Sequence, residues 1–219
     1  SSMVVGPYCF SSCDNCEMPN HSLSFDGDDD YVNIISSDEF DVSSSEGLTI
    51  SGFIKTTESG YLFNAEFGFG YWFYISESSE LVLYYNNTGN GCGANTDIRD
   101  GNWHHIAGSY DGNSIKIYVD GILDNTCENM GSLESRDGSS DVTIGNLRPQ
   151  NPNSYLDGQI DEVSVWNRPL SQQEIQDYMF NNIIGYENGL VGYWDMNAGD
   201  GDVLIDLSPN GNNGTINGA

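Results

Sequence analysis

The feature that most restricts the fold is a short alternation of apolar and polar residues that recurs along the chain between turn residues. At positions 48, 50, 52 and 54 the residues are apolar or small, and those at 49, 51 and 55 are polar. Successive side chains of a β-strand point to opposite faces, so this period of two predicts a strand with one buried face. A second such pattern, at residues 115–123, contains Asp120-Gly121, which supplies the positive φ angles of a type I′ hairpin turn.

Other segments predict the same kind of structure, and only one predicts a helix. Further strand patterns lie at residues 61–75 (two strands around a bend), 81–85, 142–144 and 160–166. The 26 glycines and 12% aromatic residues are typical of short strands joined by tight turns. Ser171 and Glu174 fit a capping box, which predicts a helix that runs to about Phe180 and covers one edge of the sheets. The sequence therefore predicts an all-β fold with one short C-terminal helix.

The charge excludes two classes of partner. The chain has 33 Asp and Glu residues against 6 Lys and Arg, a formal net charge of −27. Binding to phosphates needs a cationic surface, so we expect no nucleic-acid partner and no contact with anionic membranes. No apolar run approaches the roughly 18 residues of a membrane-spanning helix. The acidic surface is either an adaptation to a salty, divalent-rich medium or simply a means of staying soluble.

The cysteines indicate an oxidising compartment. Five cysteines in so acidic a chain favour a secreted or cell-surface protein, and we expect the chain to be part of a longer, multidomain one. Cys92 follows a predicted strand and Cys127 ends one, so a disulfide between them is expected.

Residues 1–22 are predicted to form a cysteine-containing lead-in. Cys9, Cys13 and Cys16 allow one local pair and leave one thiol over. A zinc site that includes His21 is the alternative, but a disulfide is favoured in an oxidising setting.

Several motifs, in a fixed order over roughly residues 23–180, resemble the laminin-G-like jelly-roll domains of the concanavalin A-like lectin/glucanase superfamily. The motifs are LSFDG at 23–27 with DYV at 30–32, the strand at 48–55, WHHIAGSYDG at 103–112, the hairpin at 115–121 and GQIDEVSVWNRPLS at 158–171. One motif alone would be weak, but the ordered set is specific. The resemblance implies a two-sheet antiparallel β-sandwich (jelly roll) over residues 23–185.

The segment 186–219 has two interpretations. Its pattern resembles the opening strand of a domain of this family, so it could begin a following repeat. Alternatively it folds back and completes the same sandwich, which would otherwise have an open edge with unpaired backbone groups. We favour the second, and the Asn-Gly steps at 210–211, 213–214 and 217–218 are consistent with ordered turns.

The resemblance also implies a structural calcium ion. It assigns Asp26 and Asp161 as ligands, with Asp30 as a third. Asp161 shares the parity of Val163, and Asp30 that of Val32, so both aspartates are predicted to face the core, where an unpaired charge is costly. Calcium takes six to eight oxygen ligands, which a run of aspartates such as 26–30 can supply. In the alternative interpretation, these carboxylates cap turns through backbone amides.

Carbohydrate binding is the function that the resemblance favours, through aromatic rings that stack on sugars. The predicted contact residues are Trp72, Tyr84, Tyr85, Asn86 and Asn87, with Tyr71 and Tyr74 as further candidates. In a sandwich, however, alternate aromatic residues are mostly core. Tyr84 and Tyr85 are neighbours, so only one of them can face the core.

Catalysis is not expected. The carboxylates of Asp161 and Glu162 are adjacent and so diverge, and the Glu-x-Asp-x-x-Glu run of the superfamily's glycosidases is absent. His104 and His105 lack metal-ligand spacing and are predicted to be structural. We therefore expect a monomeric, calcium-stabilised, non-catalytic module that binds carbohydrate. The alternatives are a protein–protein adhesion module, a structural spacer and, last, a glycosidase with carboxylates distant in sequence.

Overall fold

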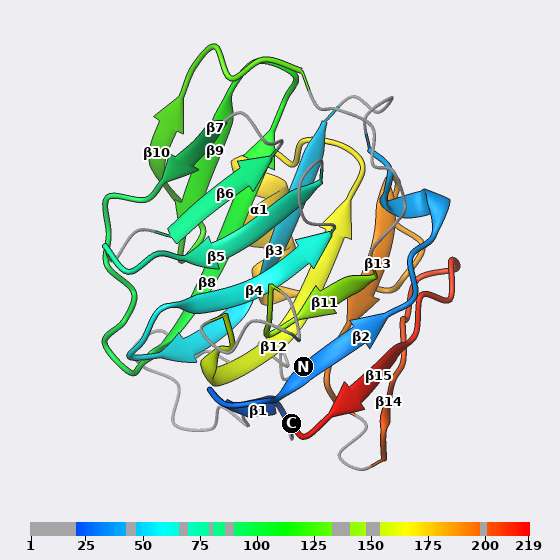
Figure 1. Cartoon of the computed structure of the whole chain (residues 1–219). Coiled ribbons are helices and arrows are strands. Elements are labelled where there is room, and N and C mark those ends of the chain that lie inside the picture. Colours follow the sequence, from blue (N-terminus) through cyan, green and yellow to red (C-terminus); the bar gives the residue numbers. More distant parts are fainter. Residues whose placement is uncertain are drawn as a thin grey trace, which may run out of the picture.

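The computed structural model describes residues 21–42, 47–65, 70–78, 81–85, 90–132, 141–147, 154–197 and 201–219. In this part of the chain, two antiparallel sheets pack face to face, with one α-helix outside them (Figure 1). The predicted all-β, two-sheet sandwich with one short helix is therefore confirmed. Among the described residues, no helix is long and apolar enough to cross a membrane.

One sheet has seven strands in the order β1-β12-β3-β8-β9-β10, with β13 also paired to β12. Their bounds are β1 Leu23–Asp26, β12 Asp157–Trp166, β3 Leu48–Thr56, β8 Trp103–Tyr110, β9 Ile115–Val119, β10 Ile122–Cys127 and β13 Leu190–Trp194. β1 and β13 lie one after the other along the same side of β12, opposite β3.

The other sheet has eight strands in the order β14-β15-β2-β11-β4-β5-β6-β7. Their bounds are β14 Val203–Leu204, β15 Gly214–Asn217, β2 Tyr31–Ile34, β11 Val142–Ile144, β4 Gly60–Ala65, β5 Tyr71–Ile75, β6 Leu81–Tyr85 and β7 Asn90–Gly93. A 3-10 turn at Asp38–Phe40 buries Phe40 between the sheets.

The apolar alternation places the core between the two sheets, as predicted. Leu48, Ile50 and Ile54 of β3 belong to the central core cluster, with Val163 and Val165 of β12. The hairpin between β9 and β10 turns at Asp120 and Gly121, whose φ angles are +51° and +72°. These positive values are those that a type I′ turn requires.

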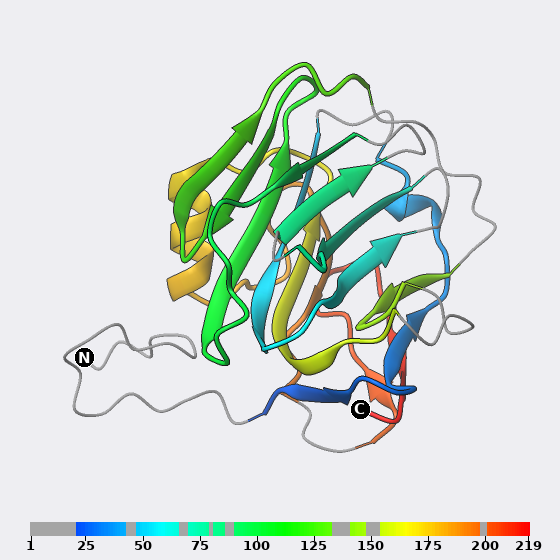
Figure 2. The same ribbon diagram turned by 60° about the vertical axis from the view of Figure 1, so that its left-hand side comes forward.

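Helix α1 (Gln172–Phe180) has the predicted capping box. The Ser171 side chain accepts a hydrogen bond from the Glu174 amide, and the Glu174 carboxylate accepts one from the Ser171 amide. We expected the helix to cover an edge, but it lies against the outer face of the seven-stranded sheet (Figure 2). There the buried Ile175 packs in one cluster with Ala107 and Tyr118, because these strand residues alternate out of the core.

The C-terminal residues contribute strands to both sheets. β13 pairs with β12, and β15 pairs with β2 in the other sheet. Trp194 at the end of β13 is fully buried, and its ring lies 6.5 Å from that of Phe40 and 6.3 Å from that of Phe63. The indole nitrogen donates a hydrogen bond to the carbonyl oxygen of Asn212.

A disulfide joins Cys92 and Cys127, with the two Cα atoms 5.7 Å apart. Cys92 is in β7 and Cys127 in β10, and these strands are the outermost of the two sheets on the same side of the sandwich (Figure 1). The bridge therefore links the two sheets at one margin. The three cysteines of the predicted lead-in, Cys9, Cys13 and Cys16, lie outside the described residues. His21, at the end of the lead-in, is exposed.

Candidate functional site

The turn between β1 and β2 gathers three carboxylates. One oxygen each from Asp26, Asp29 and Asp30 lies within 4.8 Å of the others. Asp26 and Asp29 are exposed, whereas Asp30 is 7% exposed. Burial raises the pKa of the Asp30 carboxyl, although a hydrogen bond from the Asp26 amide partly offsets this. The predicted pair Asp26 and Asp30 is thus brought together, and Asp29 joins it.

This turn meets the chemical requirements of a calcium site in part. Oxygens on opposite sides of a calcium ion, each bonded at about 2.4 Å, are about 4.8 Å apart, so the three carboxylates fit one coordination sphere. The alternative interpretation also has support, because Asp26 accepts a hydrogen bond from the Asp28 amide and Asp30 from the Asp26 amide. Each of these bonds uses only one oxygen of its carboxylate, so the turn amides do not account for the second oxygen of either aspartate.

The structure places Asp161 elsewhere. Asp161 lies four residues along β12 from Asp157, the register partner of Asp26, which is roughly 13 Å at the rise of a strand. A bulge between Asp161 and Ser164 brings both residues to the same face of β3, opposite Phe53 and Ser51. Glu162 occupies the bulge with a φ of +53°. The extra residue in the bulge turns Asp161 to the face opposite that of Val163. The prediction that Asp161 faces the core because it is two residues before Val163 is therefore wrong.

Asp161 is nevertheless buried, at 1% exposure, within a second acidic group. Its carboxylate accepts a hydrogen bond from the Glu162 amide, and the Tyr193 hydroxyl donates one to the Glu162 carboxylate. Burial, then the charge of Glu162, raises the pKa of Asp161 to about 8. Burial also raises the pKa of Glu162 to about 7, although the hydrogen bond from Tyr193 partly offsets this rise. The charge of Asp195 raises the pKa of both Asp161 and Glu162. Both carboxyl groups thus hold a proton at higher pH than a solvent-exposed carboxyl does.

A row of polar and aromatic residues crosses the outer face of the eight-stranded sheet, the face seen in Figure 1. The register pairs Asn33 with Thr143, Thr143 with Asn64, and Asn64 with Trp72, and directly opposed residues share a face. Trp72 is half-buried. Asn64 is 2% exposed, and its amide donates to Thr143 Oγ1 and to the Leu147 carbonyl, while its Oδ1 has no hydrogen-bond partner.

Beside Trp72, two tyrosine rings stack on the same face. The ring centroids of Tyr61 and Tyr74 are 5.0 Å apart at an interplanar angle of 15°, and both residues are half-buried. Burial raises the pKa of Tyr61 to about 12. Tyr71, in contrast, is a core residue whose hydroxyl donates a hydrogen bond to the Phe40 carbonyl. Among the aromatic candidates of β5, Trp72 and Tyr74 are thus on the outer face and Tyr71 is not.

The remaining carbohydrate candidates are placed by strand register alone. Tyr84 is opposite Trp72, and Tyr85 is opposite the core residue Tyr71. The row on the outer face therefore continues to the position of Tyr84. Asn86 and Asn87 lie outside the described residues.

The two histidines differ in their surroundings. His104 contacts the carboxylates of Asp120 and Asp100, and these bonds raise its pKa, Asp120 foremost. His105 is buried against Phe53 at 4.8 Å between ring centroids, and burial lowers its pKa to about 4. His105 is therefore neutral at pH 7.

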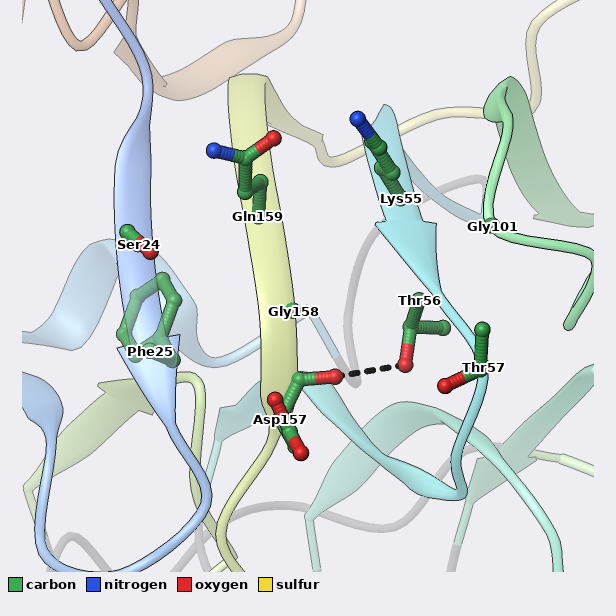
Figure 3. A pocket seen from close by; sticks show the side chains of 9 residues that line it. All are labelled: Ser24, Phe25, Lys55, Thr56, Thr57, Gly101, Asp157, Gly158 and Gln159. Atoms are coloured by element: carbon green, nitrogen blue, oxygen red, sulfur yellow. Dashed lines mark hydrogen bonds between the residues drawn. The ribbon is translucent and has the colours of Figure 1, made fainter.

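An open pocket of about 350 Å³ lies on the seven-stranded sheet, next to the acidic turn (Figure 3). Its wall carries Lys55 of β3, Gln159 of β12 and Ser24 of β1, which stand in one cross-strand row. Asp157 and Thr57 line its other end. No sequence pattern indicates this pocket, because it depends on pairing between strands about 100 residues apart.

A family model described as "Concanavalin A-like lectin/glucanases superfamily" matches residues 26–176. No curated protein sequence matches the chain.

Three solved structures have the same fold at low sequence identity. A Bacteroides ovatus protein, provisionally described as carbohydrate-binding, has a TM-score of 0.73 and 18% identity over 90% of this chain and 58% of its own. The chain thus spans somewhat more than half the length of that protein. The heptameric SAP-like pentraxin of Limulus polyphemus has a TM-score of 0.59 and 15% identity, over 93% of this chain and 98% of the pentraxin chain. Domains LG4-5 of the mouse laminin alpha1 chain have a TM-score of 0.54 and 17% identity, over 74% of this chain and 46% of the laminin chain.

Proposed function

Because this chain belongs to the concanavalin A-like lectin/glucanase superfamily, we propose that it is a non-catalytic carbohydrate-binding module of a larger secreted or cell-surface protein. The glycan binds the outer face of the eight-stranded sheet, and a calcium ion in the β1–β2 turn stabilises the fold. Residues 23–219 act as one monomeric domain in this proposal, since strands from residues 190–217 belong to both sheets.

The observation that carries the proposal is the half-buried Trp72 on the outer face, with the stacked Tyr61–Tyr74 pair beside it. Flat aromatic rings suit a pyranose, whose faces are apolar. Asn64 and Thr143 in the same row are 2% and 3% exposed and bond to backbone carbonyls, so the aromatic rings are the groups that a glycan would contact.

A non-catalytic role is supported by the adjacent pair Asp161 and Glu162. Asp161 is almost fully buried, so a substrate does not reach its carboxylate, and the half-buried Glu162 already accepts a hydrogen bond from Tyr193.

Replacing Trp72 by Ala is expected to weaken glycan binding roughly tenfold to a hundredfold. Stacking of an aromatic ring on a ligand contributes on the order of 1–3 kcal/mol, which is roughly tenfold to a hundredfold in the dissociation constant. Glycan arrays in calcium identify the polysaccharide, and isothermal titration then compares Trp72→Ala with the parent protein.

Tyr186→Ala is the matched control, because Tyr186 is 81% exposed and lies outside both sheets. The control is expected to bind as the parent does. If Trp72→Ala binds the glycan unchanged, the outer face of the eight-stranded sheet is not the site. If no glycan binds, the carbohydrate proposal is wrong.

Calcium is expected to raise the unfolding temperature through the β1–β2 turn. At a calcium concentration 100 times the dissociation constant, binding stabilises the fold by about 2.7 kcal/mol, which is roughly 5–10 °C for a domain of this size. Asp29→Asn and Asp30→Asn each remove one charged ligand, so both variants should lose most of this shift. Asp28→Asn is the control, because Asp28 is in the same turn but outside the carboxylate cluster.

Thermal scans with calcium or with excess chelator measure these shifts. A parent protein that unfolds at the same temperature in both conditions has no metal in this turn. In that case the backbone amides of Asp26 and Asp28 suffice to hold the carboxylates.

A protein–protein adhesion role is the second candidate, supported by exposed apolar residues near the C-terminus. Ile184 is 75% exposed, and the neighbouring Gly185 packs against the Leu207 backbone, so Ile184, Tyr186 and Leu207 lie near one another. Exposed apolar groups of this kind can mark protein contacts. Absence of glycan binding with a calcium response intact would favour this candidate or a structural spacer.

A further inference from the structure

We propose that the pocket on the seven-stranded sheet is a second ligand site, and that it binds a carboxylate-bearing sugar such as a uronate. It lies on a different sheet from the site at Trp72, and the proposal does not depend on that site. The volume of about 350 Å³ is within the range of roughly 300–1,000 Å³ typical of small-molecule sites. The pocket is therefore large enough for a sugar residue.

The chemistry of the pocket is set by a row of side chains across three strands. Ser24 pairs with Gln159, and Gln159 with Lys55. Directly opposed residues share a face, so a hydroxyl, an amide and an ammonium follow one another on the outer side of this sheet. Hydroxyl and amide groups form hydrogen bonds with sugar hydroxyls, and the ammonium can bind a carboxylate.

Lys55 is the residue that selects for an anion. Among the described residues, each other Lys or Arg pairs with a carboxylate: Arg99 with Asp97, Lys116 with Asp111, and Arg168 with Glu174. Lys55 has no such partner in the described part of the chain, although the protein carries a net charge of −27. A half-buried ammonium without a carboxylate is the group that a ligand carboxylate would satisfy.

The two ends of the pocket differ in charge, which orients the ligand. Figure 3 places Lys55 and Gln159 at one end and the Asp157 carboxylate and Thr57 hydroxyl at the other. A uronate would set its carboxylate on Lys55, and its hydroxyls would donate to Asp157. A ligand with carboxylates at both ends would meet repulsion from Asp157.

The wall between these ends is rigid. Thr56 Oγ1 donates to the Asp157 carbonyl at 2.6 Å and ties β3 to β12, while the Gly101 amide donates to the Thr56 carbonyl at 3.1 Å. A Cβ atom at Gly158 would lie 2.5 Å from the Lys55 carbonyl oxygen, so only glycine fits between these strands. The pocket is thus formed before a ligand arrives, which lowers the entropic cost of binding.

The net negative charge does not prevent an anion from reaching Lys55 in salt. At physiological ionic strength, charges beyond about 8 Å are largely screened, so the ligand carboxylate responds mainly to the groups that line the pocket.

Isothermal titration of the full chain in excess calcium tests the proposal with two sugars of matched shape, methyl glucuronide and methyl glucoside. Methyl glucuronide is expected to bind at least roughly tenfold more tightly, because a hydrogen bond to a charged group is the stronger kind. Lys55→Met should remove this preference. Lys116→Met makes the same charge change at a paired lysine on the same sheet and should leave binding unchanged.

The outcomes separate this site from the one at Trp72. Glucuronide binding that persists in Trp72→Ala and is lost in Lys55→Met establishes the second site, whether or not the glycan array identifies another ligand. Equal binding of the two sugars, an unchanged Lys55→Met, or no binding of either sugar at tens of millimolar overturns the proposal. Binding of acetate as tight as that of the glucuronide would also overturn it, since the pocket would then recognise a carboxylate and not a sugar.

Discussion

A chain shortened to residues 1–185 is expected to lose its cooperative unfolding transition. The truncation removes β13 from its place beside β12 and β15 from its place beside β2, so both sheets lose a paired strand. It also removes Trp194, which is fully buried against Phe40 and Phe63. Circular dichroism and urea titration would show a weakly structured chain that does not unfold in one step.

The full-length variant Trp194→Ala isolates part of this effect. Removal of a large buried aromatic side chain costs about 3–5 kcal/mol, a large share of the roughly 5–15 kcal/mol that stabilises a typical domain. We expect this variant to fold with a much lower midpoint, and Tyr186→Ala to unfold as the parent does. A truncated chain as stable as the parent would instead assign residues 186–219 to a following repeat.

The second large effect concerns Asp161, whose replacement by Asn is expected to stabilise the protein at neutral and alkaline pH. Burial raises the pKa of Asp161 from its usual value near 4 to about 8 in the folded state. The folded protein therefore binds this proton more tightly than the unfolded chain does, and stability falls as pH rises from about 4 to about 8. One pKa unit corresponds to about 1.4 kcal/mol, so the gain in Asp161→Asn at pH 8 is on the order of a few kcal/mol.

Urea titrations at several pH values measure the difference between Asp161→Asn and the parent. This difference in the free energy of unfolding should be small near pH 4 and grow up to pH 8. The buried His105 has the opposite effect, because it lowers stability as pH falls from 6.5 to about 4. Both proteins contain His105, so its contribution cancels in the difference. Asp177→Asn, a change of an exposed aspartate in α1, is the control. If Asp161→Asn lowers stability in calcium, Asp161 binds a cation, as its assignment as a calcium ligand predicts.

The fold was largely predictable because strand signals are local. Alternation in β3 and the positive φ angles needed at Asp120-Gly121 depend on neighbours in sequence, and both agree with the structure. The site was less predictable. Asp161 lies on the face opposite to the predicted one, because Glu162 forms a β-bulge with a φ of +53°. No pattern in the surrounding residues indicates this bulge.

Residues brought together by long-range pairing could not be inferred from spacing. Ser24, Lys55 and Gln159 form one row only because β12 lies between β1 and β3. The carboxylates of Asp26, Asp29 and Asp30, in contrast, belong to one turn, so their closeness follows from the run of aspartates at 26–30. A site within one turn can thus be predicted from the sequence, whereas a pocket formed by several strands can be predicted only when their pairing register is known.

The Cys92–Cys127 bridge also limits how far the protein lengthens under tension. Force applied through β1 and β15 acts at one side of the sandwich, whereas β7 and β10 carry the bridge at the other (Figure 1). Whatever the order in which the other strands separate, the bridge would hold its enclosed loop closed. The cysteines are 35 residues apart, so the unfolded, oxidised chain is shorter by roughly 120 Å at about 3.5 Å per residue. In a protein anchored at a surface, the redox state of this one bond would set the reach of the stretched chain.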